Sequence, residues 1–145
     1  MKKNCYTKDT FSKFIEIGGK DRNNFLQSII TNDINKCIND KVLIYSCLLS
    51  PQGKFLADFF IVNLGDYYLI EINTKYFDLF CNKLKMYKLR SDVKIKENNN
   101  LISIILYNNQ LNSKLLISYP DPRGSKIGFK VYIDKNSLND LSELE

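Results

Sequence analysis

The sequence predicts one α+β domain over residues 1–145, with a mostly antiparallel sheet and helices packed on one side of it. Short segments that alternate apolar and polar residues, or are apolar throughout, are separated by Gly, Pro and Asn turns. Two longer segments place their apolar residues at helical spacing instead. The chain has 145 residues, 44% of them hydrophobic, which is enough for one core.

The first third of the chain predicts a strand followed by two helices. Residues 14–17 alternate and then meet Gly18 and Gly19, which is typical of a short strand ending in a turn. The next segment, KDRNNFLQSII, has helical spacing of its apolar residues. A second, shorter helix is expected to begin within TNDINK.

The middle of the chain predicts a three-stranded meander. Residues 42–49 are apolar on both faces, which suits a strand inside a sheet. Residues 50–53 (SPQG) form a hairpin turn, residues 55–62 return, and residues 67–72 make the third strand.

The rest of the chain predicts one strong helix and further short strands. Residues 75–89 carry an apolar face at helical spacing. Strands are expected around residues 93–95, 101–107, 115–118 and 129–133, and a short helix near the C-terminus.

Composition excludes several classes of chemistry. The chain has no histidine, so a Ser-His or Cys-His nucleophile pair cannot form. Its four cysteines lack a C-x-x-C pair, so neither a metal site nor a disulfide framework is expected. No stretch reaches the roughly 18 apolar residues of a membrane span, and we expect a cytoplasmic protein with no membrane partner.

Asp58 is the most informative single residue. If residues 54–62 are extended, Asp58 shares its face with Leu56, Phe60 and Val62, which are all apolar. An unpaired buried carboxylate is costly, so Asp58 must be paired, protonated or facing a ligand. One interpretation is a position at a sheet edge or a pairing with Arg or Lys. The other is an acid that accepts hydrogen bonds from a flat heterocycle.

Four motifs in order resemble the first half of the YgfZ/GcvT-type folate-binding family, closer to its YgfZ branch. They are IEIGGKDRNNFLQSIITNDI, then YSCLLSPQGKFLADFFIV followed by YYLIEI, then MYKLRSDVKIKE, and finally DPRGSKIGF. The resemblance implies a fold like the folate-binding domain of the aminomethyltransferases. It also implies binding of tetrahydrofolate or a derivative, and a role in supporting iron-sulfur cluster enzymes, including enzymes of tRNA modification.

The same resemblance separates folate binding from catalysis. The strand that reads G-G-x-x-D-D in aminomethyltransferases corresponds here to residues 53–58, with Ala57 in place of the first acid. This difference argues against aminomethyl transfer and leaves Asp58 as a folate-binding candidate, with no independent catalysis expected. The K-G-C-Y-x-G-Q-E motif of the YgfZ branch lies beyond the matched region. A partner chain that carries the missing half, or a scaffold module that has lost folate binding, is therefore the alternative.

Two further family positions are candidates for the folate site. Asn32 and Asp33 match a recurring triplet, although helix capping explains them equally well. Arg90 matches a family arginine that could hold the anionic tail of folate, or pair with a structural acid such as Asp92 or Asp58.

A basic run raises the question of RNA contact. It comprises Lys83, Lys85, Lys88, Arg90, Lys94 and Lys96. The formal net charge is +5, which tolerates nucleic acid without requiring it. Such a run is usually a solvated face, and its one aromatic residue, Tyr87, belongs to the apolar face of the helix, so RNA contact has little support.

Overall fold

A computed structural model describes residues 6–39, 42–107 and 117–137. Contacts along the chain divide it into two compact units. The central unit is Lys13–Asn98, and the terminal unit combines Met1–Ser12 with Asn99–Glu145. Each unit contains its own sheet, and the two are described separately.

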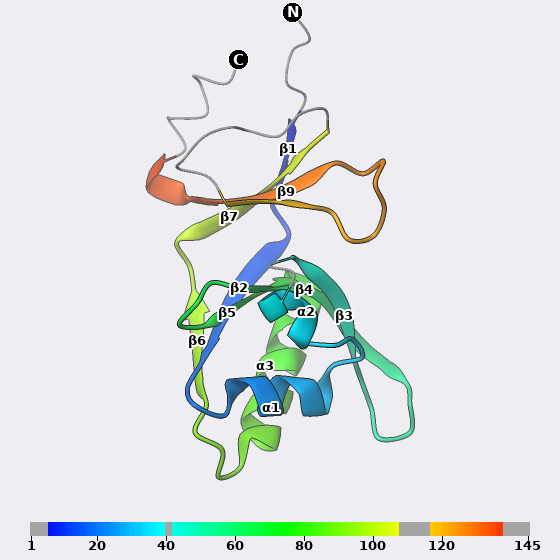
Figure 1. Cartoon of the computed structure of the whole chain (residues 1–145), viewed down its shortest axis with the longest axis vertical. Coiled ribbons are helices and arrows are strands. Elements are labelled where there is room, and N and C mark those ends of the chain that lie inside the picture. The colour runs from blue at the N-terminus through cyan, green and yellow to red at the C-terminus, as the bar shows by residue number, and fades with distance from the viewer. Residues whose placement is uncertain (1–5, 40–41, 108–116, 138–145) are drawn as a thin grey trace, which may run out of the picture. The chain divides into compact units, whose positions relative to one another are not determined.

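The central unit is built on a five-stranded sheet with the strand order β3-β4-β5-β2-β6 (Figure 1). The pairs β3–β4, β4–β5 and β2–β6 are antiparallel. The consecutive strands β3, β4 and β5 are neighbours, so the predicted meander is confirmed. The strands are β2 (Ser12–Gly18), β3 (Ile44–Leu49), β4 (Phe55–Asn63), β5 (Tyr68–Asn73) and β6 (Lys94–Asn98).

Three helices cover one face of this sheet. They are α1 (Arg22–Ile29), α2 (Asn35–Asn39) and α3 (Thr74–Lys88). Alternate residues of β4, namely Ala57, Phe59 and Ile61, lie in the same buried cluster as apolar side chains from all three helices. The rings of Phe59 and Phe80 are 4.7 Å apart, which fixes α3 against β4. The predicted arrangement, helices on one side of a mostly antiparallel sheet, is confirmed.

The ends of α3 are set by local chemistry. Asn73 Oδ1 accepts a hydrogen bond from the backbone N–H of Lys75 at 2.9 Å, which caps the first turn. Lys85 and Lys88 lie in the last turn, where positive charge complements the helix dipole. The helix therefore starts where β5 ends and carries the chain to the opposite end of the sheet.

The terminal unit has a four-stranded sheet with the order β1-β7-β9-β8, in which each neighbouring pair is antiparallel. Its strands are β1 (Tyr6–Asp9), β7 (Leu101–Leu106), β8 (Ile117–Pro120) and β9 (Phe129–Asp134). Strand β1 was not predicted, because its residues are largely polar and exposed. The helix predicted near the C-terminus falls largely on residues 138–145, outside the described residues.

The DPRG motif forms the turn between β8 and β9. The carboxylate of Asp121 is fully buried, and Arg123 donates to it through its backbone N–H and through two guanidinium nitrogens. Gly128 has φ +102, and a Cβ at this position would collide with the backbone oxygen of Leu106. This family-like motif thus acts as a structural turn.

Candidate functional site

Asp58 lies on the sheet face opposite the helices. Its neighbours on β4, Ala57 and Phe59, belong to the core beneath the helices, so the alternation of a strand turns Asp58 to the other face. Asp58 is half-buried, and the predicted face assignment of β4 is correct.

The partner of Asp58 is a tyrosine. The Tyr45 hydroxyl donates to Asp58 Oδ2 at 2.5 Å, a length typical of a hydroxyl bound to a carboxylate. The Tyr45 ring also lies 5.3 Å from the ring of Phe60, centroid to centroid. The sequence left open a pairing of Asp58 with Lys or Arg. Within the described ranges, no Lys or Arg forms an ion pair with Asp58.

Asp58 lies where the pairing of β4 with β5 ends. In the register of β4 with β5, pairing begins at Phe59, opposite Ile72. Asp58 is therefore next to Asn73, the last residue of β5, and on β3 it pairs directly with Cys47. Among the described residues, Tyr45 is the only one that donates a hydrogen bond to the Asp58 carboxylate, at Oδ2. Oδ1 can therefore accept from a further donor.

Cys47 faces the same side of the sheet as Asp58 but is poorly suited to act as a nucleophile. Burial raises the pKa of the Cys47 thiol, the negative charge of Asp58 raises it further, and the hydrogen bond with Thr31 only partly offsets these effects. The thiol is therefore the stable form at neutral pH. Cys47 thus places an uncharged side chain beside the carboxylate.

Tyr45 and Cys47 were not identified from the sequence, because β3 is apolar on both faces and offers no alternation to assign its residues. Counting outward from the predicted turn at residues 50–53 would pair Cys47 with Leu56, and an irregularity between Leu48 and Leu49 shifts the register so that Cys47 lies opposite Asp58 instead.

Asn32 lies at the open edge of β3, beside Tyr45. Its Nδ2 donates to the backbone oxygen of Tyr45 at 2.9 Å. Its Oδ1 accepts from the backbone N–H of Asp33 and from Lys36 Nζ. Both ends of the Asn32 amide are thus engaged, and Asp33 Oδ1 accepts from the N–H of Asn35 at the start of α2.

Arg90 lies apart from Asp58 and Asn32. It is exposed in the loop that follows α3. The helix begins beside the Asp58 end of β4, and its 15 residues separate its two ends by about 22 Å. Arg90 lines a surface hollow with Asp21, Leu89 and Ser91, and the carboxylate of Asp21 already accepts from the N–H of Asp92. The structure does not bring Arg90 together with the other two predicted site residues.

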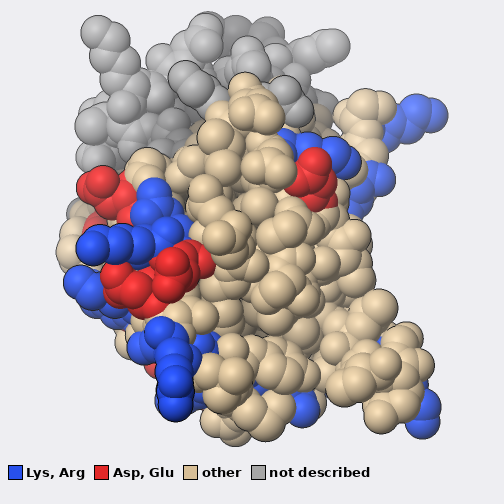
Figure 2. Space-filling model, turned by 60° about the horizontal axis from the view of Figure 1, so that its bottom comes forward, with Lys and Arg blue, Asp and Glu red and all other residues tan. Residues whose placement is uncertain are grey.

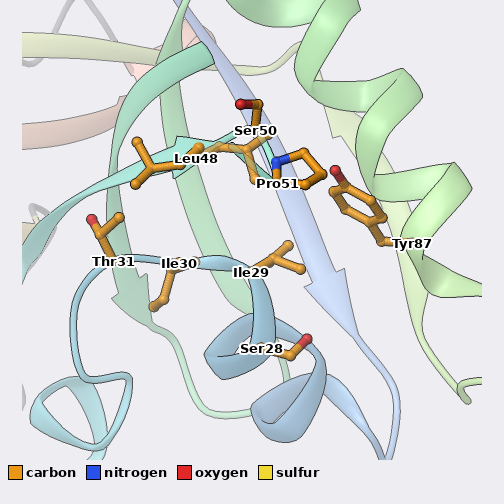
Figure 3. Close-up of a pocket in the computed structure, with 9 residues that line it drawn as sticks. Ser28, Ile29, Ile30, Thr31, Leu48, Ser50, Pro51 and Tyr87 are labelled. Atoms are coloured by element: carbon orange, nitrogen blue, oxygen red, sulfur yellow. The ribbon is translucent and has the colours of Figure 1, made fainter. Parts of the chain in front are cut away.

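A separate cavity of about 500 Å³ lies on the helix side of the β3–β4 hairpin (Figure 3). The end of α1, the hairpin turn and α3 form its walls, and Tyr87 projects from α3 toward Pro51. Its lining residues are Ser28, Ile29, Ile30, Thr31, Leu48, Leu49, Ser50, Pro51 and Tyr87. None of these carries a charge, and Leu48 belongs to the core beneath the helices, so this cavity is distinct from the Asp58 face.

The basic run does not form a continuous positive surface. Lys96 pairs with Glu16 at 3.8 Å, and the nearby Lys13 pairs with Glu97 at 3.2 Å. Lys83 stands over the ring of Tyr87 at 5.8 Å, so this ring is covered by a cation of the same helix. On the face shown in Figure 2, charged side chains of both signs lie next to each other and much of the remaining surface is uncharged.

The described residues contain neither a group of metal ligands nor a membrane-spanning helix. In the part of the chain that the structure describes, no three His, Cys, Asp or Glu side chains are grouped so that they could hold a metal ion. In the same ranges, none of the helices combines the length and the apolar character that a membrane crossing requires.

Comparison of sequences finds relatives of two kinds, although no family model matches the chain. An aminomethyltransferase of Staphylococcus epidermidis is 40% identical over 60 residues, which cover 41% of this chain and 16% of that protein. The mitochondrial iron-sulfur cluster assembly factor IBA57 homologue of Neurospora crassa is 34% identical over 97 residues, covering 62% of this chain and 22% of that protein. Its counterpart in Mycosarcoma maydis is 25% identical over 88% of this chain and 36% of its own length.

Comparison of structures gives the fold class. The crystal structure of the glycine cleavage system aminomethyltransferase T from Bartonella henselae matches with a TM-score of 0.71 over 96% of this chain and 44% of that one, at 14% sequence identity. The fold is therefore α+β and aminomethyltransferase-like. Together with the sequence relatives, this supports the GcvT-like resemblance, while the matched regions span little more than a third of the curated relatives at most.

Proposed function

We propose that this chain is a folate-binding protein of YgfZ type that supports iron-sulfur cluster enzymes, including those of tRNA modification. The observation that carries the proposal is the half-buried carboxylate of Asp58, held by Tyr45 and flanked by apolar side chains. The aminomethyltransferase-like fold and the similarity to the iron-sulfur cluster assembly factors support it. The two units together would correspond to the first part of such a protein, and a cytoplasmic location remains part of the proposal.

The proposed mechanism is capture of a tetrahydrofolate derivative without catalysis. The ring system of the ligand would lie against Tyr45, whose ring packs on the buried Phe60, and an N–H of the ligand would donate to Asp58 Oδ1. The residues fit such a group, since a carboxylate beside aromatic side chains accepts from a flat N–H donor while the aromatic surface covers the ring.

The other two predicted residues, Asn32 and Arg90, lie at different distances from Asp58. Asn32 contacts the backbone of Tyr45 and belongs to the same end of the sheet. Arg90, exposed beyond the far end of α3, is proposed only for the anionic tail of an extended ligand.

Thermal unfolding with and without folinic acid tests the proposal. A ligand that binds only the native state stabilises it by about 2.7 kcal/mol at a hundredfold excess over Kd, so a rise in Tm that grows with folinic acid concentration is expected. An unchanged Tm up to millimolar folinic acid would rule out folate binding by this chain.

A second candidate function is an interaction module without folate binding. Phe55 is 51% exposed near the start of β4 and packs edge-on against Tyr76, with a ring separation of 5.7 Å. Leu49 and Leu79 are also exposed, and such apolar surface can dock a partner chain. Substituting Phe55→Ser should abolish association with a chain that carries the missing half, while leaving any folinic acid binding intact.

Aminomethyl transfer is the least supported function. Ala57, which replaces the first acid of the family pair, is completely buried in the core beneath the helices. The chain therefore keeps a single acid, Asp58, at this place. Turnover of an aminomethyl-lipoyl donor would contradict this assignment.

A further inference from the structure

Residues Ile30, Thr31 and Asn32 form a strap along the open edge of β3. Ile30 makes an isolated bridge with Leu48. The N–H of Thr31 donates to the oxygen of Cys47 at 3.2 Å, and Thr31 Oγ1 accepts from the N–H of Cys47 at 2.9 Å. Asn32 then donates to the oxygen of Tyr45 at 2.9 Å. The strap thus occupies edge groups that a neighbouring strand would otherwise bind.

Ser46, which lies between Tyr45 and Cys47 on β3, binds the strap through its side chain. Its side chain is buried, and its Oγ accepts from the backbone N–H groups of both Thr31 and Asn32, at 3.1 and 3.2 Å. Tyr45, Ser46 and Cys47 are therefore hydrogen-bonded to the strap, and Leu48 forms a bridge with it. Their inner side is bonded to β4.

The strap lies opposite Asp58 across β3. Asp58 pairs directly with this part of β3, whereas the pairing of β4 with β5 starts at Phe59 and leaves Asp58 beside Asn73, the last residue of β5. Tyr45 supplies the hydroxyl, and Cys47 stands directly across the strand pair. A displacement of β3 at Tyr45 would therefore move the phenol relative to Asp58.

We propose that Asn32 and Thr31 are positioning residues for Asp58, acting through Tyr45 rather than by contact with a ligand. Both ends of the Asn32 amide are engaged within the protein, which agrees with an indirect role. The consequence for ligand affinity rests on the proposed folate binding. The consequence for the Tyr45–Asp58 hydrogen bond does not, so the two can be tested separately.

The test without ligand measures the ζ-carbon NMR shift of the Tyr45 ring, assigned by its loss in Tyr45→Phe. Thr31→Val keeps the shape of the side chain and removes the hydroxyl, whereas Thr31→Ser restores it. We expect Thr31→Val and Asn32→Ala to move the Tyr45 shift toward that of Asp58→Ala, and Thr31→Ser to resemble the wild type.

Asp33→Ala is the matched control. Asp33 lies in the same loop and caps α2 through Asn35, but its recorded bonds do not reach β3. This variant should leave the Tyr45 signal unchanged. A shift in Asp33→Ala equal to that in Thr31→Val, or no shift in either strap variant, would overturn the proposal. Should Asn32→Ala fail to fold, Thr31→Val at its exposed position decides the question.

The test with ligand is a double-mutant cycle measured with folinic acid. Loss of one hydrogen bond in the support should weaken binding about three- to tenfold in Asn32→Ala. If Asn32 acts through Tyr45, the same substitution in a Tyr45→Phe background should have almost no further effect. Equal losses in both backgrounds would refute the route through Tyr45. Absence of folinic acid binding in the wild type would refute the proposed function and leave the NMR test of the strap intact.

Discussion

The hydroxyl of Tyr45 reaches Oδ2 of Asp58 diagonally across the β3–β4 pair, at 2.5 Å. Direct register pairs Tyr45 with Phe60 and Asp58 with Cys47, so the hydrogen bond joins two cross-strand pairs that are two positions apart and share one face of the sheet. It gives one oxygen of the carboxylate a strong donor within the protein.

Tyr45→Phe should lower the free energy of unfolding by about 1–2 kcal/mol, because a hydrogen bond to a charged group contributes more than a neutral one. Urea unfolding measures this. Tyr76→Phe is the control, since that ring packs on Phe55 and no hydrogen bond of its hydroxyl is recorded among the described residues. Equal losses in both variants would mean that the Tyr45 hydroxyl contributes nothing specific.

Asp58→Asn should make Cys47 react with iodoacetamide at lower pH. The negative charge of Asp58 disfavours the thiolate and is one cause of the raised pKa of Cys47, so removing the charge lowers that pKa. Mass spectrometry of the Cys47 peptide gives the rate against pH. Asp78→Asn is the control, because Asp78 raises the pKa of Cys81 instead. A Cys47 profile that is unchanged in Asp58→Asn would contradict the close approach of the two groups.

Gly19→Ala should destabilise the protein by more than about 2 kcal/mol. Gly19 has φ +100, and an added Cβ would collide with the backbone oxygen of Asp92. Gly53 has φ +78 but nothing within 4 Å of an added Cβ, so Gly53→Ala should cost only about 1 kcal/mol of backbone strain. Similar losses in the two variants, measured by urea unfolding, would exclude the close contact at Asp92.

Asp121 should contribute to the acid sensitivity of the protein. Burial would raise the pKa of Asp121, but hydrogen bonds and charge from Arg123, with Lys130, outweigh it and hold the pKa below its usual value. The pair therefore stabilises the fold above the unfolded pKa of about 3.9, and this contribution is lost as the pH falls through the lower folded pKa.

Asp121→Asn should thus be less stable than the wild type at pH 7 and lose less stability between pH 5 and pH 2. Urea midpoints across this range measure the effect, with the exposed Asp66→Asn as the control. A parallel acid slope in Asp121→Asn and in the wild type would show that Asp121 is not stabilised by Arg123.

Much of the fold could be predicted because its signals are local. The hairpin turn at residues 50–53 and the alternation of β4 fix which face Asp58 occupies, and the apolar spacing of α3 identifies its buried side. Strand β1 could not be found in this way, because its polar residues become a strand only by pairing with β7.

The site was less predictable because it depends on contacts between segments. Tyr45 is one apolar residue among many in β3, and its role becomes visible only from the register with β4. Asn32 was ambiguous between ligand binding and capping, and the sequence did not reveal its hydrogen bond to the edge of β3. The position of Arg90 depends on the full length of α3, which the motif order does not convey.

The central claim is that Asp58 accepts a hydrogen bond from a bound folate, and calorimetry of folinic acid binding to the wild type, Asp58→Asn and Asp66→Asn tests it most directly. We expect saturable binding by the wild type and by Asp66→Asn, and binding at least about tenfold weaker by Asp58→Asn, because a charged acceptor is lost. Equal affinity in all three proteins would contradict the claim.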